Sequence, residues 1–247
     1  MNSFELQALF EIFFVLFSTT ILINRLSITD SNFFLGAKYK ALLISLPFLA
    51  ISAKRVLSLA YVPDETRFMY FAISNELDKL NLPELLFAPN IDGFGSMFWS
   101  ITGMALKVTS FFTGVEWGEW PSNWNSLQIY DDDFMLDIYS IQLVRGISLL
   151  TVLLWFRMFV RETIDNRGIS KYLPLLVLTL PVMWWGGKVS SPELICAGLA
   201  GMSGIYVSKG NFARAILFVS LAAGFKISAM PILICVLLVS VLSLNQD

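Results

Sequence analysis

Two adjacent carboxylates, Asp64 and Glu65, follow Pro63 directly after an apolar segment. Arg67 and a mostly apolar run with helical spacing come next, within the stretch Tyr61–Leu77. Carboxylates at such a position can deprotonate an acceptor hydroxyl or hold a divalent cation. Taken by itself, an Asp-Glu pair could also be a solvated helix start. Other features of the chain are needed to distinguish a functional site from such a helix start.

Further acids and cations are available to complete a site with this pair. Asp131, Asp132 and Asp133 form a second acidic run, whose alternative is a solvated loop with a helix cap. Cations can neutralise a phosphate leaving group, such as that of a lipid-phosphate sugar donor presented at the membrane surface. The candidate cations are Arg67, Arg145, Lys188 and Lys226, with Lys54 and Arg55 behind them.

Three of these cations, Lys188, Lys226 and Arg145, can be weighed against a purely structural role. Lys188 and Lys226 could simply anchor the chain at the membrane interface. Arg145 lies inside an apolar segment, where a charged side chain needs a counter-charge, and the nearby outer acids are candidates.

The composition of the 247 residues sets the class of protein. Hydrophobic residues make up 56% and charged residues only 15%, against roughly 25% charged in a soluble domain. A polytopic, all-helical membrane protein is therefore predicted. The net charge of −2 gives no reason to propose nucleic-acid binding. The absence of histidine excludes a Ser-His-Asp triad. Cys196 and Cys235 lie in apolar runs and are predicted to be packing residues.

About seven segments are apolar enough to be predicted as membrane spans. Lys and Arg residues in the connections alternate between the two sides, which places the N-terminus outside and the C-terminus in the cytoplasm. Lys54 and Arg55 interrupt the second span, either by snorkelling to the outer surface or by contacting an anionic headgroup. The predicted spans are Phe4–Ile23, Ala41–Tyr61, Ile138–Val160, Tyr172–Trp185, Leu194–Val207, Ala215–Phe225 and Ile227–Leu244.

Residues 64–137 are predicted to form a long extracytoplasmic loop with amphipathic helices. Within it, Gly95–Thr113 is apolar but carries several small polar residues and one Lys. A helix lying in the interface is favoured there, because a full crossing would spoil the charge alternation further on. Asp137 is an alternative cap for the third span. Residues 1–247 are predicted to form one membrane domain, with no internal repeat.

In order along the chain, these features resemble the GT-C superfamily of polytopic glycosyltransferases. The similarity is greatest to the protein O-mannosyltransferases and the bacterial lipid A aminoarabinose transferases. It runs from about residue 41 to the end of the chain and is diffuse outside Asp64-Glu65. The residues that carry it are P-D-E-T-R-F at Pro63–Phe68, Ile91–Leu106, V-R-G-I-S-L-L at Val144–Leu150, S-P-E-L at Ser191–Leu194 and A-G-F-K at Ala223–Lys226.

The resemblance implies sugar transfer from a polyprenyl-phosphate donor on the outer face of a bacterial inner membrane. It implies that Asp64 is the general base or a metal ligand, supported by Glu65. One or more of Asp131–Asp133 would complete a Mg²⁺ or Mn²⁺ site, and the cations named above would contact the donor phosphate.

Two departures from the family keep a non-catalytic alternative open. Phe4–Ile23 precedes what would be the family's first span, and the chain stops at Asp247, whereas family members usually carry more spans. The alternative is a membrane subunit that binds a lipid carrier, or a scaffold within a glycan-assembly or secretion complex with a membrane-protein partner. A transporter ranks lowest, because acidic residues are nearly absent from the predicted spans.

Overall fold

The computed structural model describes residues 3–28, 36–57, 72, 80–81, 83–84, 95–113, 133–163, 169–180, 183 and 192–244. Within these ranges the chain is all-helical, as predicted, and short 3₁₀ turns occur at Ile169–Tyr172 and Ile227–Ala229. The α-helices are α1 (Ser3–Ile28), α2 (Ala37–Val56), α5 (Ser96–Thr113), α6 (Asp133–Thr163), α7 (Leu173–Leu178), α9 (Pro192–Ser208), α10 (Phe212–Phe225) and α11 (Met230–Leu244).

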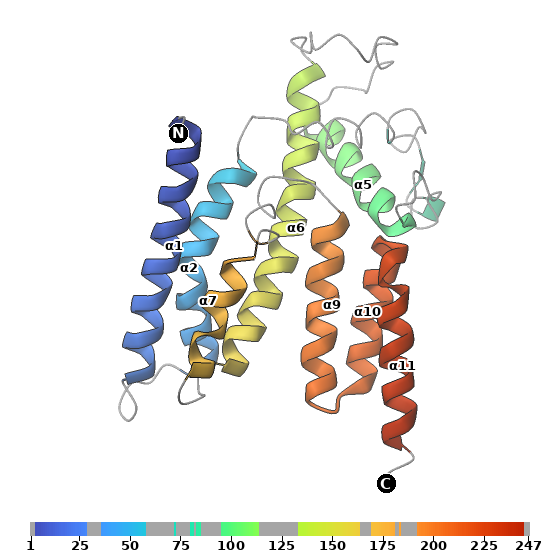
Figure 1. The fold of residues 1–247 in the computed structure, drawn as a ribbon. Helices are drawn as coiled ribbons and strands as arrows, with labels where there is room; N and C mark the ends of the chain where they lie inside the picture. Colours follow the sequence, from blue (N-terminus) through green and yellow to red (C-terminus); the bar gives the residue numbers. More distant parts are fainter. Residues whose placement is uncertain are drawn as a thin grey trace.

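The long helices lie side by side and alternate in direction (Figure 1). Helix α1 packs on α2, α2 on α6, α6 on α9, α9 on α10, and α10 on α11. Helix α5 packs against both α6 and α10, near the end of the bundle at which α6 begins. The N-terminus lies at that same end of the molecule and the C-terminus at the other.

Two of the described helical segments, Leu6–Leu26 and Tyr139–Thr163, are long and apolar enough to cross a membrane. Large apolar side chains on α1 point away from the rest of the protein, with Phe10 69% and Phe13 67% exposed. Exposed apolar surface of this extent is typical of contact with lipid or with a partner. The shorter helical segments Phe212–Phe225 and Ile227–Ser243 are also apolar.

Helix α6 begins earlier than the third predicted span. The helix starts at Asp133, so residues 133–137 of the predicted outer loop belong to it. Asp137 consequently lies inside the helix and does not cap it. The apolar part that is long enough to span begins only at Tyr139.

The fourth predicted span is interrupted. Helix α7 covers only Leu173–Leu178, and a turn follows in which the Thr179 N–H donates to the carbonyls of Leu175 and Leu176. Pro181 comes directly after this turn. Proline lacks an N–H and disfavours helical backbone in the residue before it, which explains why one continuous helix over Tyr172–Trp185 does not form.

A glycine turn joins α9 to α10. Gly210 adopts a φ of 67°, which glycine reaches without steric cost. The N–H of Gly210 donates to the Val207 carbonyl and the N–H of Asn211 to the Tyr206 carbonyl, the Schellman arrangement. The Asn211 side chain then caps α10 by accepting from the Arg214 N–H.

One further helix start lies in the predicted outer loop. Asn81 Oδ1 accepts from the Glu84 N–H at 2.9 Å, and Glu84 Oε2 accepts from the Asn81 N–H at 2.8 Å. This reciprocal pair is a capping box. Pro83 therefore lies in the first turn of a helix, where its missing N–H costs nothing.

Candidate functional site

The structure describes the side chains of three predicted site residues, Lys54, Arg145 and Lys226. Two more, Arg55 near the end of α2 and Asp133 at the start of α6, are described in their backbone alone. The remaining predicted site residues lie outside the described part of the chain: Asp64, Glu65, Arg67, Asp131, Asp132 and Lys188.

One hydrophobic cluster, here called the α5 core, joins α5, α6, α9 and α10. Ala72, from the stretch Tyr61–Leu77, is fully buried in this cluster. Ala72 lies eight residues after Asp64 in the sequence. The members of the α5 core are Ala72, Phe98, Trp99, Ala105, Leu106, Ile141, Val144, Ile195, Cys196, Leu199, Met202, Ala222, Phe225 and Ala229.

Helix α5 is fixed to α10 by a direct backbone contact. The N–H of Gly95 donates to the Phe225 carbonyl at 3.0 Å. A Cβ at position 95 would come within 1.9 Å of the Gly224 carbonyl oxygen, so only glycine permits this approach. The segment that opens α5 therefore lies against the end of α10, next to Lys226.

Lys226 forms an ion pair with Glu193, with Nζ donating to Oε1. Glu193 lies in the first turn of α9, where the helix dipole favours a carboxylate. Both side chains retain partial exposure, 28% for Lys226 and 46% for Glu193. The pair holds the Lys226 ammonium in place, and a phosphate would have to compete with Glu193 for it.

Arg145 is almost completely buried, with 2% of its surface exposed. It lies twelve residues after the start of α6, about 18 Å along the helix axis. This position inside the bundle agrees with the prediction from its apolar surroundings. Burial of a guanidinium is unfavourable unless hydrogen bonds or opposite charge compensate it.

A hydrogen-bonded polar contact links α5 to α6 near the start of α6. The Ser140 hydroxyl donates to Thr109 Oγ1 at 3.0 Å, and the Thr109 hydroxyl donates to the Ala105 carbonyl at 2.9 Å. Both side chains are buried. The contact fixes the α5–α6 crossing through polar groups as well as through the α5 core.

The sequence reasoning overlooked Glu11 of α1. Lys54 Nζ lies 3.1 Å from Glu11 Oε1, and Gln7 Nε2 donates to the same oxygen at 3.2 Å. Glu11 is buried, whereas the Lys54 side chain remains 61% exposed. The signal was a carboxylate well inside one apolar segment and a Lys in the next antiparallel one, since ionisable groups within spans tend to pair.

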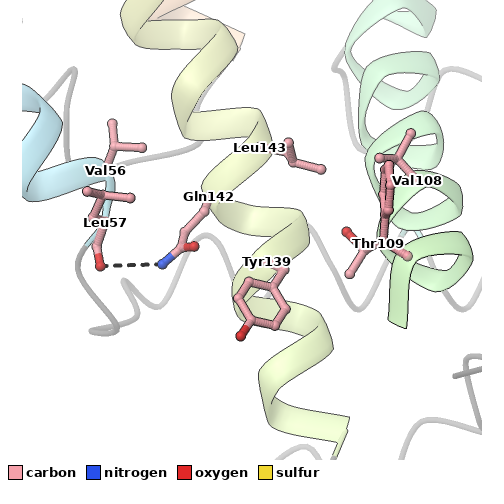
Figure 2. Close-up of a pocket in the computed structure, with 8 residues that line it drawn as sticks. Val56, Leu57, Val108, Thr109, Tyr139, Gln142 and Leu143 are labelled. Atoms are coloured by element: carbon pink, nitrogen blue, oxygen red, sulfur yellow. Dashed lines mark hydrogen bonds between the residues drawn. The ribbon is translucent and has the colours of Figure 1, made fainter. Parts of the chain in front are cut away.

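A cavity of about 510 Å³ opens where α2, α5 and α6 meet (Figure 2). The Gln142 amide donates across it to the Leu57 carbonyl at 3.4 Å, at the end of α2. Nothing in the sequence analysis predicted this cavity, because it depends on how three separate helices pack. It is lined by Val56, Leu57, Val108, Thr109, Phe112, Tyr139, Gln142 and Leu143.

The metal site stays a prediction. Within the described residues, no group of three or more acidic, histidine or cysteine side chains is arranged to hold a metal ion. The side chains of the predicted ligands Asp64 and Asp131–Asp133 lie outside those the structure describes.

Comparison with known proteins adds no relative: no family model, no curated protein and no solved structure matches this chain.

Proposed function

We propose that this chain is a polytopic membrane glycosyltransferase of the GT-C type, which transfers a sugar from a polyprenyl-phosphate donor on the outer face of a bacterial inner membrane. The proposed topology has about seven spans, with the N-terminus outside and the C-terminus in the cytoplasm. Helix α5 would lie as a juxtamembrane helix at the outer interface.

The observation that carries the proposal is the convergence of the segments on which the resemblance rests. Ala72 follows P-D-E-T-R-F, Phe98 and Trp99 belong to Ile91–Leu106, and Val144 precedes Arg145. All of these residues lie in the α5 core. The S-P-E-L and A-G-F-K segments meet there as well, through the Glu193–Lys226 ion pair. Segments far apart in sequence are thus gathered around α5, as a shared site would require.

In the proposed reaction Asp64 acts as general base, supported by Glu65. The acceptor hydroxyl oxygen forms a bond to the anomeric carbon while the bond from that carbon to the donor phosphate breaks. Asp64 takes the hydroxyl proton, and polyprenyl phosphate leaves with the bonding electron pair. The charge of the leaving phosphate would be neutralised by cations, with Arg145, Lys188 and Lys226 as the main candidates.

Asp131–Asp133 are proposed to complete a Mg²⁺ or Mn²⁺ site with Asp64, since these hard cations prefer carboxylate oxygens. Arg67, Lys54 and Arg55 would support the binding of the donor phosphate. These roles follow from the resemblance and from the chemistry of the side chains.

Replacing Asp64 tests the proposal. The Asp64→Ala protein is assayed for sugar transfer from a polyprenyl-phosphate donor, with Asp247→Ala as the matched control at the end of the chain. Loss of a general base should lower the rate by about 100-fold or more, whereas the control should retain its rate. Full activity of Asp64→Ala would overturn the catalytic assignment.

One alternative is left open by the sequence analysis. In this alternative the chain is a non-catalytic subunit that binds a lipid carrier within a larger complex. Purification of a stoichiometric membrane-protein partner, with turnover of the donor only in the complex and unchanged by Asp64→Ala, would support it.

A further inference from the structure

The cavity between α2, α5 and α6 lies at one end of an apolar segment. Tyr139 and Gln142 in its wall belong to the first turn of Tyr139–Thr163, the part of α6 long enough to span a membrane. Val56 and Leu57 line the cavity at the end of α2, and Figure 2 shows Val108 and Thr109 of α5 on the other side of α6. The cavity therefore lies where the apolar surface of the bundle meets its polar end.

Two of the polar side chains in this wall, Gln142 and Thr109, form hydrogen bonds within the protein itself. The Gln142 amide donates to the Leu57 carbonyl. Thr109 accepts from Ser140 and donates to Ala105. A polar ligand would have to displace these bonds, whereas a hydrocarbon would leave them intact. The lining thus favours an apolar occupant.

The mouth of the cavity is formed by exposed apolar side chains. Phe112 is 80%, Leu57 68% and Leu143 41% exposed. In a bilayer such side chains touch lipid, so a lipid chain reaches the cavity without crossing water. An empty space of this size would forfeit dispersion contacts along its walls, and a chain that enters it would restore them.

We propose that this cavity binds one acyl chain of a membrane phospholipid as a resident lipid. The cavity's volume of about 510 Å³ lies in the usual range of ligand pockets and accommodates a single hydrocarbon chain.

Photolabelling in nanodiscs tests the proposal. The probe is a phosphatidylglycerol with a diazirine at the end of one acyl chain, and mass spectrometry locates the adducts. Adducts are expected on residues 108–112 and 139–143. Val108→Trp or Leu143→Trp fills the cavity from either wall and should lower this labelling about tenfold, which corresponds to about 1.4 kcal/mol of binding free energy. Leu150→Trp, on an exposed side of α6 outside the lining, should leave it unchanged.

Several results would overturn the assignment. One is equal labelling of the wild type and both cavity-filling variants, and another is an equal loss in Leu150→Trp. A third is preferential labelling of the same residues by a diazirine-bearing polyprenyl phosphate, which would make the cavity a carrier site. None of these labelling measurements depends on sugar transfer. The lipid-binding proposal can therefore be tested even if the protein proves not to be a glycosyltransferase.

Discussion

The Glu11–Lys54 pair joins a buried carboxylate to a mostly exposed ammonium. The two single substitutions should therefore be unequal. In Lys54→Ala the buried Glu11 loses its counter-charge, which should cost about 1–3 kcal/mol. In Glu11→Ala the Lys54 side chain, which is mostly exposed, can extend toward the polar interface, and the cost should be smaller. Thermal unfolding of the purified protein in detergent measures both.

The double variant Glu11→Ala/Lys54→Ala serves as the control for this pair. It should unfold at a higher temperature than Lys54→Ala alone, because no buried charge remains unpaired. If Glu11→Ala were the more damaging single change, the carboxylate would have a role other than pairing with Lys54.

At the scale of single residues, sequence reasoning placed some charges correctly and missed others. The burial of Arg145 followed from its apolar neighbours. The partner of Lys54 did not follow, because the prediction weighed only lipid and solvent around that side chain and not the facing helix. Glu193 and Lys226 were placed on the same side of the membrane, but only the packing of α9 against α10 shows that they touch.

The α6–α9 contact depends on two small residues. A Cβ added at Gly201 would come within 2.3 Å of the Trp155 indole nitrogen, and one at Gly198 within 3.0 Å of a Thr151 methyl. Gly201→Ala should therefore force the helices apart and destabilise the protein by about 1–3 kcal/mol. Unfolding in detergent with increasing denaturant measures the change.

Gly204 provides the matched control on the same helix. Nothing lies within 4 Å of a Cβ added there, so Gly204→Ala should be neutral, or stabilising by up to about 1 kcal/mol through helix propensity. Equal destabilisation by both substitutions would contradict the assignment of Gly201 to the helix contact.

The attachment of α5 to α10 gives a second prediction at this scale. Gly95→Ala should be destabilising by about 1–3 kcal/mol, because its Cβ meets backbone that cannot move aside. Gly224→Ala should cost less, since its Cβ would meet the flexible thioether of Met97. Limited proteolysis between α5 and α6 measures how far each variant loosens the attachment of α5. A larger effect of Gly224→Ala than of Gly95→Ala would contradict the assignment of the rigid contact to Gly95.

Elements were predictable where the apolar run was long. The helix over Phe4–Ile23 and the helix over Gly95–Thr113 both form, within a few residues of the predicted limits. The interruption before Pro181 was not predicted, because the span Tyr172–Trp185 was predicted from hydropathy alone. The early start of α6 was missed because the residues before Tyr139 include acidic ones and were therefore predicted to be loop.

For the whole molecule, the alternation of helix directions makes a topological prediction. In a variant without Cys196 and Cys235, single cysteines are introduced as Glu84→Cys and Ser208→Cys, both at exposed positions. A membrane-impermeant maleimide applied to intact spheroplasts should label position 84 and leave position 208 unlabelled, because the two lie at opposite ends of the proposed bundle. Labelling of both positions, or of position 208 alone, would contradict the proposed orientation.

The side assignments came from Lys and Arg counts alone. Arg25 lies in the last turn of α1 and Arg161 in the last turn of α6, and these two helices finish at the same end of the bundle (Figure 1). The packing of α5 against α6 and α10 was beyond prediction, because it depends on contacts between segments far apart in the sequence.

The length of α10 has a consequence for how the chain enters a membrane. Its 14 residues span about 21 Å, short of the roughly 30 Å hydrocarbon thickness of a bilayer. The Gly210 turn and the 2.8 Å bond from Ser203 Oγ to the Ala215 carbonyl tie it to α9. Under the proposed topology, α9 and α10 would leave the translocon together as a prefolded hairpin. The surrounding lipid would thin to match α10, drawing the outer interface down toward Lys226.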